Sequence, residues 1–334
     1  MFSHAIVGRS AVTRALLERI ELVSRSEVPV LIEGESGTGK ELVARALHEN
    51  GPRRAFPIVA LNCGALSDSL LESELFGYHR GAFTGAHGEK PGLVEAAHRG
   101  TLFLDEVGDL STHAQTRLLR VLQGGEVIRL GGLGPKRVDV RILSATHRCL
   151  EDEIRRGRFR QDLYYRLRVV SIRVPPLRER AGDIDALVGH FLGRYAPDAP
   201  PEVEAEAMAR LAAYPWPGNV RELENEVRRA VTLHGRRGVI GPEVLSPRIR
   251  DHAAGTPRGT TLRERISRFE AIVIREALDK YEWNKTRAAR ALGLSRQSLI
   301  RKVSRYGLAR PQAPSPGGRV RAGRAAERSG PRSC

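Results

Sequence analysis

One short segment, GESGTGKE at 34–41, limits the fold more than any other part of the chain. Gly34, Gly39 and Lys40 have the spacing G-x-x-x-x-G-K, which lets backbone N–H groups surround the phosphates of a nucleotide while the lysine contacts their oxygens. The segment follows a short β-branched run, 27–33, and precedes the helical pattern ELVARALHE. This order of strand, loop and helix predicts a nucleotide-binding α/β domain.

Two acids follow another apolar run, GTLFLDEV at 100–107. We expect Asp105 to hold Mg²⁺ directly or through water, and Glu106 to orient and deprotonate the water that attacks a phosphate. Glu41 stands where the general loop motif has the Ser or Thr that binds magnesium, so Asp105 is the expected metal ligand. The loop residues expected to bind ATP are Gly34, Glu35, Ser36, Gly37, Thr38, Gly39, Lys40 and Glu41.

The hydrophobic pattern divides the chain into successive parts. Apolar runs of strand length, PIVALNC, GTLFLDE and VDVRILSAT, alternate with amphipathic segments and predict an α/β core with a mainly parallel sheet over 1–180. The strand pattern stops after PPLRER, so 181–245 is predicted to be a helical lid and 246–260, which mixes Pro, Gly and charge, a linker. Residues 261–309 are predicted to be all-α, and the basic tail 310–334 to be disordered.

Positive charge is concentrated near the C-terminus. The chain carries a formal charge of +16, of which residues 260–310 contribute +8 (13 Lys and Arg against 5 Asp and Glu) and residues 311–334 contribute +4. Only +4 is left for residues 1–259. This distribution predicts a polyanionic partner such as DNA for the C-terminal part, although an Arg-rich tail can also serve solubility alone.

Nothing in the sequence indicates export or insertion into a membrane. No apolar run approaches the roughly 18 residues that a membrane span needs, and the start MFSHAIVGRS lacks the order of a signal peptide. Cys63, Cys149 and Cys334 are far apart and lack metal-ligand spacing, which disfavours a disulfide framework or a zinc site. We therefore expect a cytoplasmic protein.

The most specific motif is GAFTGA at 81–86, which has no acid, base or metal ligand of its own. Together with LNCGAL, FRQDLYYRL, PPLRER and WPGNVREL, in this order, it makes the chain similar to the bacterial enhancer-binding proteins, the sigma-54-dependent transcription activators of the AAA+ superfamily. The similarity runs from Ile6 to about Leu308. It implies an α/β AAA+ P-loop NTPase domain with a mainly parallel sheet, a small helical lid and a C-terminal all-α helix-turn-helix domain of the Fis type.

The resemblance also implies roles for residues around the ATP site. Asn62 is implied to hold the catalytic Glu106 in an inactive position. Arg160 and Arg166 match the arginine fingers that reach the γ-phosphate bound by a neighbouring subunit, a role that suits the permanent charge of a guanidinium. Shared sites of this kind imply a homo-oligomer in which dimers assemble into a hexameric ring.

Two further positions match the nucleotide sensors of the family. Arg221, in GNVREL, corresponds to the second sensor, an arginine of the lid that contacts the same phosphate. Thr146 belongs to the first sensor, where the family usually reads A-T-N-R and this chain has His147 in place of the asparagine. The histidine is larger and can titrate near neutral pH, so its effect on coupling is left open.

The segment at 283–308 predicts a helix-turn-helix. Thr286 to Leu292 is expected to form one helix, Gly293 to turn the chain and Ser295 to cap a second helix whose first residues enter the major groove of DNA. Within the DNA-binding surface that begins at Ser295, Arg296, Gln297, Ser298 and Arg301 are expected to contact bases, and Lys302 and Arg305 to contact phosphates.

The implied function is that of an ATP-hydrolysing activator, bound to an upstream DNA site, which remodels the closed complex of sigma-54 RNA polymerase. The expected contact with sigma-54 is Gly81, Ala82, Phe83, Thr84, Gly85 and Ala86. Two alternatives stay open: a DNA-binding regulator with an AAA+ fold that acts without sigma-54, and a generic AAA+ remodeller. Because only five residues precede Ile6, control is expected from a separate regulatory protein, a partner subunit or the expression level, unless the chain is a fragment.

Overall fold

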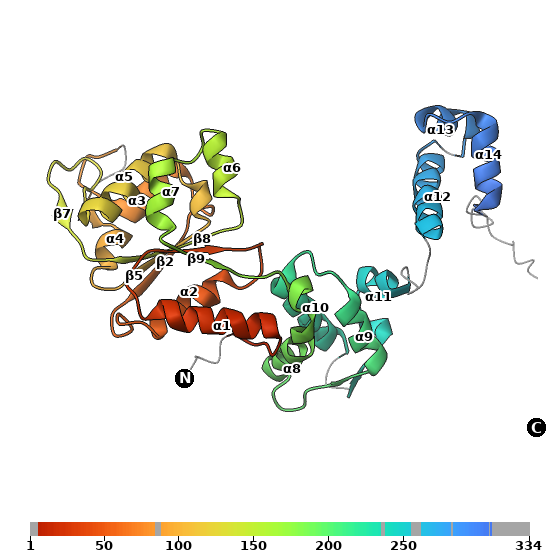
Figure 1. The fold of residues 1–334 in the computed structure, drawn as a ribbon, viewed down its shortest axis with the longest axis horizontal. Coiled ribbons are helices and arrows are strands. Elements are labelled where there is room, and N and C mark those ends of the chain that lie inside the picture. The colour runs from red at the N-terminus through yellow and green to blue at the C-terminus, as the bar shows by residue number, and fades with distance from the viewer. Residues whose placement is uncertain are drawn as a thin grey trace, which may run out of the picture. The chain divides into compact units, whose positions relative to one another are not determined.

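The chain divides into two compact units, residues 1–255 and residues 256–334 (Figure 1). The structure is a computed structural model that describes residues 6–83, 88–234, 238–254, 262–281, 283–306 and 308. Among these residues, no helix is both long and apolar enough to cross a membrane. The tail predicted at 310–334 lies outside the described residues.

A five-stranded sheet in which all neighbouring strands are parallel forms the centre of the first unit. This confirms the predicted parallel α/β core. The edge strand β9 was missed by the sequence analysis, because its short sequence VSIR has one fully buried residue and lacks a long apolar run. The strand order is β2 (Ile58–Asn62), β5 (Thr101–Asp105), β8 (Arg141–Thr146), β1 (Val30–Glu33) and β9 (Val170–Arg173).

Helices cover both faces of the sheet, because successive side chains of each strand point to opposite sides (Figure 1). In β5, Leu102 and Leu104 pack into one apolar cluster and Phe103 into another. The Phe103 cluster includes α1 (Ala11–Ser24) and α2 (Lys40–Glu49). The opposite face is covered by α3 (Asp68–Phe76), α4 (Leu93–Ala96), α5 (Thr112–Gly124), α6 (Leu150–Arg155) and α7 (Gln161–Leu167).

A smaller lid follows β9 and has its own core, centred on the fully buried Trp216. It confirms the predicted helical lid, and it also contains a short parallel pair of strands, β10 and β11. It also extends past residue 245, since Ile249 of α11 is buried in the lid core, so much of the predicted linker is part of the lid. Its elements are η2 (Leu177–Asp183), α8 (Ile184–Tyr195), β10 (Glu202–Val203), α9 (Ala205–Ala213), α10 (Asn219–His234), β11 (Val239–Ile240), η3 (Pro242–Val244) and α11 (Pro247–Ala254).

The described part of the second unit contains three helices, α12 (Leu262–Lys280), α13 (Lys285–Ala291) and α14 (Arg296–Arg305). The turn between α13 and α14 contains Gly293 at φ 68°, a left-handed conformation that glycine adopts without steric cost. Ser295 then caps α14 by accepting a hydrogen bond from the backbone N–H of Ser298 at 3.1 Å. The predicted helix-turn-helix is therefore present.

Candidate functional site

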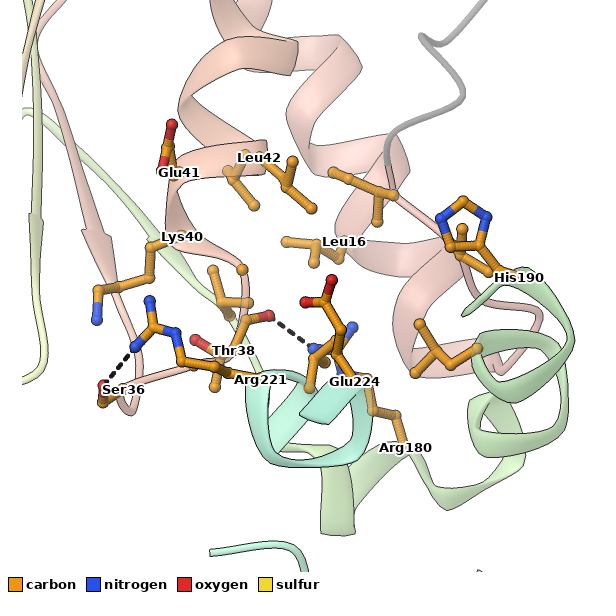
Figure 2. Close-up of a pocket in the computed structure, with 18 of the residues that line it drawn as sticks. Leu16, Ser36, Thr38, Lys40, Glu41, Leu42, Arg180, His190, Arg221 and Glu224 are labelled. Carbon is orange, nitrogen blue, oxygen red and sulfur yellow. Dashed lines mark hydrogen bonds between the residues drawn. The ribbon is translucent and has the colours of Figure 1, made fainter. Parts of the chain in front are cut away.

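A cavity of about 670 Å³ lies between the loop at 34–41 and the lid (Figure 2). Its position follows from topology, because the loop after β1 and the acids after β5 both stand at the carboxyl edge of one parallel sheet. Both charged and apolar groups line the cavity. Polar lining residues include Lys40, Asn62, Asp105, Glu106, Arg180 and Arg221, and apolar ones include Val7, Leu16, Leu187, Phe191 and Val220.

The loop itself wraps closely around the lysine. Gly37 and Gly39 have φ values of 76° and 100°, which an L-amino acid with a side chain rarely adopts. Lys40 is 6% exposed, and its ammonium donates to the backbone carbonyl of Gly34 at 2.9 Å and to Glu106 at 3.3 Å. The predicted arrangement of loop lysine and acidic strand end is thus assembled at one place.

The two acids at the end of β5 have different surroundings. Burial, followed by the charge of neighbouring Glu106, raises the pKa of Asp105. Burial also acts to raise the pKa of Glu106, but the hydrogen bonds from His147 and the charge of Lys40 outweigh it and lower that pKa. Asp105 is therefore a carboxylate that a nearby cation would stabilise, whereas Glu106 already has its partners.

Asn62 does not make the contact that the resemblance implied. Its amide donates to Asp105 at 3.5 Å, and its carbonyl accepts from the backbone N–H of Gly64 at 2.9 Å. The carboxylate of Glu106 is instead bonded by His147, through the backbone N–H at 3.1 Å and ring atom Nδ1 at 2.6 Å. β5 lies between β2 and β8, and the register places Asn62 opposite Asp105. Glu106, one residue farther along, instead meets His147, which directly follows β8.

Two side chains of the lid, Arg180 and Asn219, donate hydrogen bonds to the backbone of the loop at 34–41. Arg180, only 4% exposed, donates to the carbonyl of Thr38 at 2.8 Å (Figure 2). The amide of Asn219 donates to the carbonyl of Ser36 at 3.0 Å and to the carboxylate of Glu35 at 3.1 Å. Sequence reasoning named neither residue, although both lie in the motifs PPLRER and WPGNVREL that it had noted.

Two arginines of the lid add charge to the same contact. Arg221, the residue expected to act as second sensor, lines the cavity and donates to the hydroxyl of Ser36 at 3.3 Å (Figure 2). Arg178 forms a bidentate pair with Glu35, with N to O distances of 2.8 and 2.5 Å. Hydrogen bonds from Arg178 and then from Asn219 lower the pKa of Glu35 to about 2. The loop is therefore fixed to the lid at Glu35, Ser36 and Thr38.

Five expected residues do not line this cavity within their own chain: Gly34 and Glu35 of the loop, and Thr146, Arg160 and Arg166. Thr146 is buried, and its hydroxyl accepts from the backbone N–H of Arg148 at 3.0 Å. Arg160, at the start of α7, pairs with Asp162 at 2.7 Å. Arg166, in the same helix, is exposed. Neither arginine is among the residues that line the cavity of its own chain.

Asp105 is the lining carboxylate best suited to a divalent cation. Asp105 has a carboxylate whose burial disfavours its charge, which a cation would relieve. Glu41 also lines the cavity, but its carboxylate pairs with Arg45 at 2.9 Å. Among the described residues, no cluster of three or more His, Cys, Asp or Glu could form a metal site by itself. The residues present therefore fit a cation that shares its ligands with nucleotide phosphates and water.

The described residues next to the gap at 84–87 follow or precede a two-stranded stem formed by β3 (Gly77–Tyr78) and β4 (Lys90–Pro91). The ring of Phe83 packs edge-on against Tyr78 at a centroid distance of 5.1 Å and stays 45% exposed. Ala82 donates its backbone N–H to His79 at 3.1 Å. Of the expected contact residues, Thr84, Gly85 and Ala86 lie outside the described residues.

This stem is joined to the neighbouring hairpin of β6 (Glu126–Val127) and β7 (Lys136–Arg137). Leu130, between these strands, exchanges backbone hydrogen bonds with Gly77 and His79. Arg129 then pairs with Glu95 at 2.6 Å and with Glu89 at 3.0 Å. The base of the GAFTGA loop is therefore fixed by both backbone and ionic contacts.

The second unit presents most of its expected DNA-binding residues to solvent. Arg296, Gln297, Arg301 and Arg305 are exposed on α14, while Leu299 and Val303 face the core. Lys302 differs from the expectation, because its ammonium pairs with Glu270 of α12 at 2.6 Å. It is thus less available to a phosphate than the exposed arginines.

Comparison with known proteins agrees with this arrangement. The Sigma-54 interaction domain family matches residues 6–173, the AAA+ ATPase lid domain matches 178–262, and the Fis family of bacterial regulatory proteins matches 261–306. The hydrogenase transcriptional regulatory protein HoxA of Cupriavidus necator is 47% identical over 315 residues, which cover 88% of this chain and 64% of HoxA. The transcriptional regulatory protein ZraR of Escherichia coli K12 is 50% identical over 306 residues, 90% of this chain and 68% of ZraR.

Solved structures give the same picture. The crystal structure of NtrX from Brucella abortus in complex with ATP has a TM-score of 0.70 and 36% sequence identity, and the match covers 91% of this chain and 70% of NtrX. The complex of NtrX with ADP gives the same values. With its parallel-sheet AAA+ P-loop domain, its lid and its DNA-binding helix-turn-helix, this chain belongs to the family of sigma-54-dependent transcriptional regulators.

Proposed function

We propose that this protein hydrolyses ATP and uses the energy to remodel the closed complex of sigma-54 RNA polymerase, while its second unit binds an upstream DNA site. The observation that carries the proposal is the convergence of Lys40, Asp105, Glu106 and Arg221 on one cavity. Phosphates in that cavity would meet the Lys40 ammonium and the backbone N–H groups at the start of α2.

The proposed roles follow from the chemistry of these side chains. Asp105 would hold Mg²⁺, which neutralises phosphate charge when bound. Glu106 would orient water and accept its proton, and Arg221 would contact the terminal phosphate from the lid. Arg160 and Arg166 would complete the site of a neighbouring subunit in a ring, since both are exposed and neither reaches its own cavity.

A dilution series of the full chain tests the shared site. The ATPase rate per subunit should rise steeply with protein concentration, because a monomer lacks the arginines of its neighbour. Arg166→Ala should lower the rate at high concentration while leaving nucleotide affinity within about twofold, because the arginine acts on transition-state charge. A rate per subunit that stays constant across the series would refute the shared site.

Open-complex formation tests the link to sigma-54. Thr84→Ala should abolish open complexes at a sigma-54 promoter in vitro and leave ATP hydrolysis and DNA binding near the wild-type level. Unchanged transcription with this variant would refute the proposed contact. Footprinting should also find a site with dyad symmetry upstream of such promoters, whereas binding without sequence preference would favour a generic remodeller.

A further inference from the structure

The carboxylate of Glu106 is held at both oxygens in this structure. Oε1 accepts from the Lys40 ammonium at 3.3 Å, and Oε2 accepts from the backbone N–H of His147 at 3.1 Å and from its ring Nδ1 at 2.6 Å. Glu106 itself is fixed at a left-handed φ of 54° and its side chain is 17% exposed. The carboxylate therefore has a defined resting position.

We propose that His147 is a positioning residue that keeps Glu106 in this resting position, and that ATP hydrolysis requires the contact between the His147 ring and Glu106 to break. This inference rests on the proposed ATPase function of the same site. His147 does not itself line the cavity, and its hydrogen bonds reach the site through Glu106, which does.

The number of hydrogen bonds that the carboxylate oxygen Oε2 can accept supports this assignment. A carboxylate oxygen has two lone pairs, and both acceptor directions of Oε2 are used by the two donors of His147. A general base must instead direct a free lone pair at water. The resting contact and proton abstraction through Oε2 therefore exclude each other.

Asn62 cannot hold the Glu106 carboxylate in this way, because its side chain is bonded elsewhere. Its side-chain N–H groups face Asp105 at 3.5 Å, and its carbonyl oxygen is occupied by the N–H of Gly64. The ring of His147, in contrast, is 44% exposed and stands at the open end of β8, so it can turn away without disturbing the core. A partly exposed hydrogen bond of this kind is strong enough to favour one position of the Glu106 carboxylate and weak enough to break during catalysis.

Two substitutions of nearly equal polarity, His147→Asn and His147→Gln, separate the side-chain hydrogen bond to Glu106 from other effects of replacing the histidine. The Nδ2 of an asparagine is attached at the same position of the side chain as Nδ1 of histidine, so His147→Asn can keep the bond to Glu106. The amide nitrogen of a glutamine lies one bond farther out, like Nε2 of the ring, so His147→Gln loses it. The backbone N–H at 3.1 Å stays in both variants.

The basal ATPase activity of the full chain is then measured for wild type and both variants at one saturating protein concentration. We expect His147→Gln to raise kcat about fivefold, the size set by losing one partly exposed charge-assisted hydrogen bond, with KM for ATP unchanged within about twofold. His147→Asn should stay within about twofold of wild-type kcat. A kcat for His147→Gln equal to or below that for His147→Asn would overturn the proposal, because the histidine would then be passive or would assist catalysis.

A second measurement does not depend on hydrolysis. Nitrogen-15 NMR of the histidine rings, with the His147 signal assigned through His147→Asn, should show a proton on Nδ1 in the nucleotide-free protein and its loss in Glu106→Ala. An Nδ1 signal that is the same in both proteins would refute the contact. If wild type lacks ATPase activity at every concentration, the proposed function fails, while the NMR comparison still decides whether His147 holds Glu106.

Discussion

Replacing Asn219 tests how strongly the lid is fixed to the nucleotide-binding loop. Its side chain is fully buried, and its carbonyl oxygen accepts from the backbone N–H of the buried Leu177 at 2.9 Å. Its amide reaches Ser36 and Glu35, and its backbone has a left-handed φ of 55°. One residue thus connects the start of the lid, the start of α10 and the loop.

The expected cost can be divided between hydrogen bonds and backbone conformation. In Asn219→Gly the buried N–H of Leu177 loses its acceptor, which costs about 1–3 kcal/mol, and the two contacts to the partly solvated loop add about 1 kcal/mol. In Asn219→Ala the same bonds are lost and an alanine is forced into the left-handed region, which costs about 1 kcal/mol more. We therefore expect Asn219→Gly to be destabilised by about 2–4 kcal/mol and Asn219→Ala by about 3–5 kcal/mol.

Urea unfolding monitored by tryptophan fluorescence measures this difference. Trp216 is fully buried in the lid core, and replacing Trp283 by Phe in every variant leaves Trp216 as the reporter. If Asn219→Gly unfolds within about 0.5 kcal/mol of the parent, the buried hydrogen bonds contribute nothing measurable and the reasoning about the lid contact is wrong. If the glycine and alanine variants are equal, the backbone at this position is not strained.

Three further results are expected. Phe103→Ala should lower the free energy of unfolding by about 3–5 kcal/mol in urea titrations, because this central ring is 2% exposed between the sheet and two helices. The pKa of Glu35 falls from its ordinary 4.5 to about 2, so its ion pair contributes stability that is fully present above about pH 4.5 and lost as the pH falls towards 2. The difference in Tm between wild type and Glu35→Gln should therefore shrink over that window. In fluorescence anisotropy with target DNA, Arg305→Ala should reduce the slope of log K against log salt by about 0.9 and Lys302→Ala by less than half as much, because the lysine is already paired with Glu270.

Short-range patterns were sufficient to predict the position of the main site. The loop around Lys40 and the acids at Asp105 and Glu106 are each encoded within a few residues, and a parallel sheet brings the ends of its strands to one edge whatever the details of packing. The turn at Gly293 and the cap at Ser295 are likewise local, and both were predicted correctly.

Contacts that depend on distant parts of the chain were not predictable in the same way. Whether Glu106 pairs with Asn62 or with His147 depends on the order of strands in the sheet and on how far each side chain reaches. The extent of the lid depends on Ile249, a single apolar residue in a polar segment, which becomes significant only when it fits into the lid core. No period or spacing in the sequence encodes either fact.

The positively charged side chains of Lys40 and Arg221 already have oxygen partners within the protein. A nucleotide that binds in the cavity must therefore compete with these partners. The Lys40 ammonium donates to a carbonyl and a carboxylate, and Arg221 donates to the hydroxyl of Ser36. An incoming phosphate would replace these oxygens with its own. Because Lys40 and Arg221 already have oxygen partners in the nucleotide-free protein, neither bears the full cost of removing an unpaired charge from water. Because Arg221 belongs to the lid and Lys40 to the core, the same exchange would change the contacts between the two.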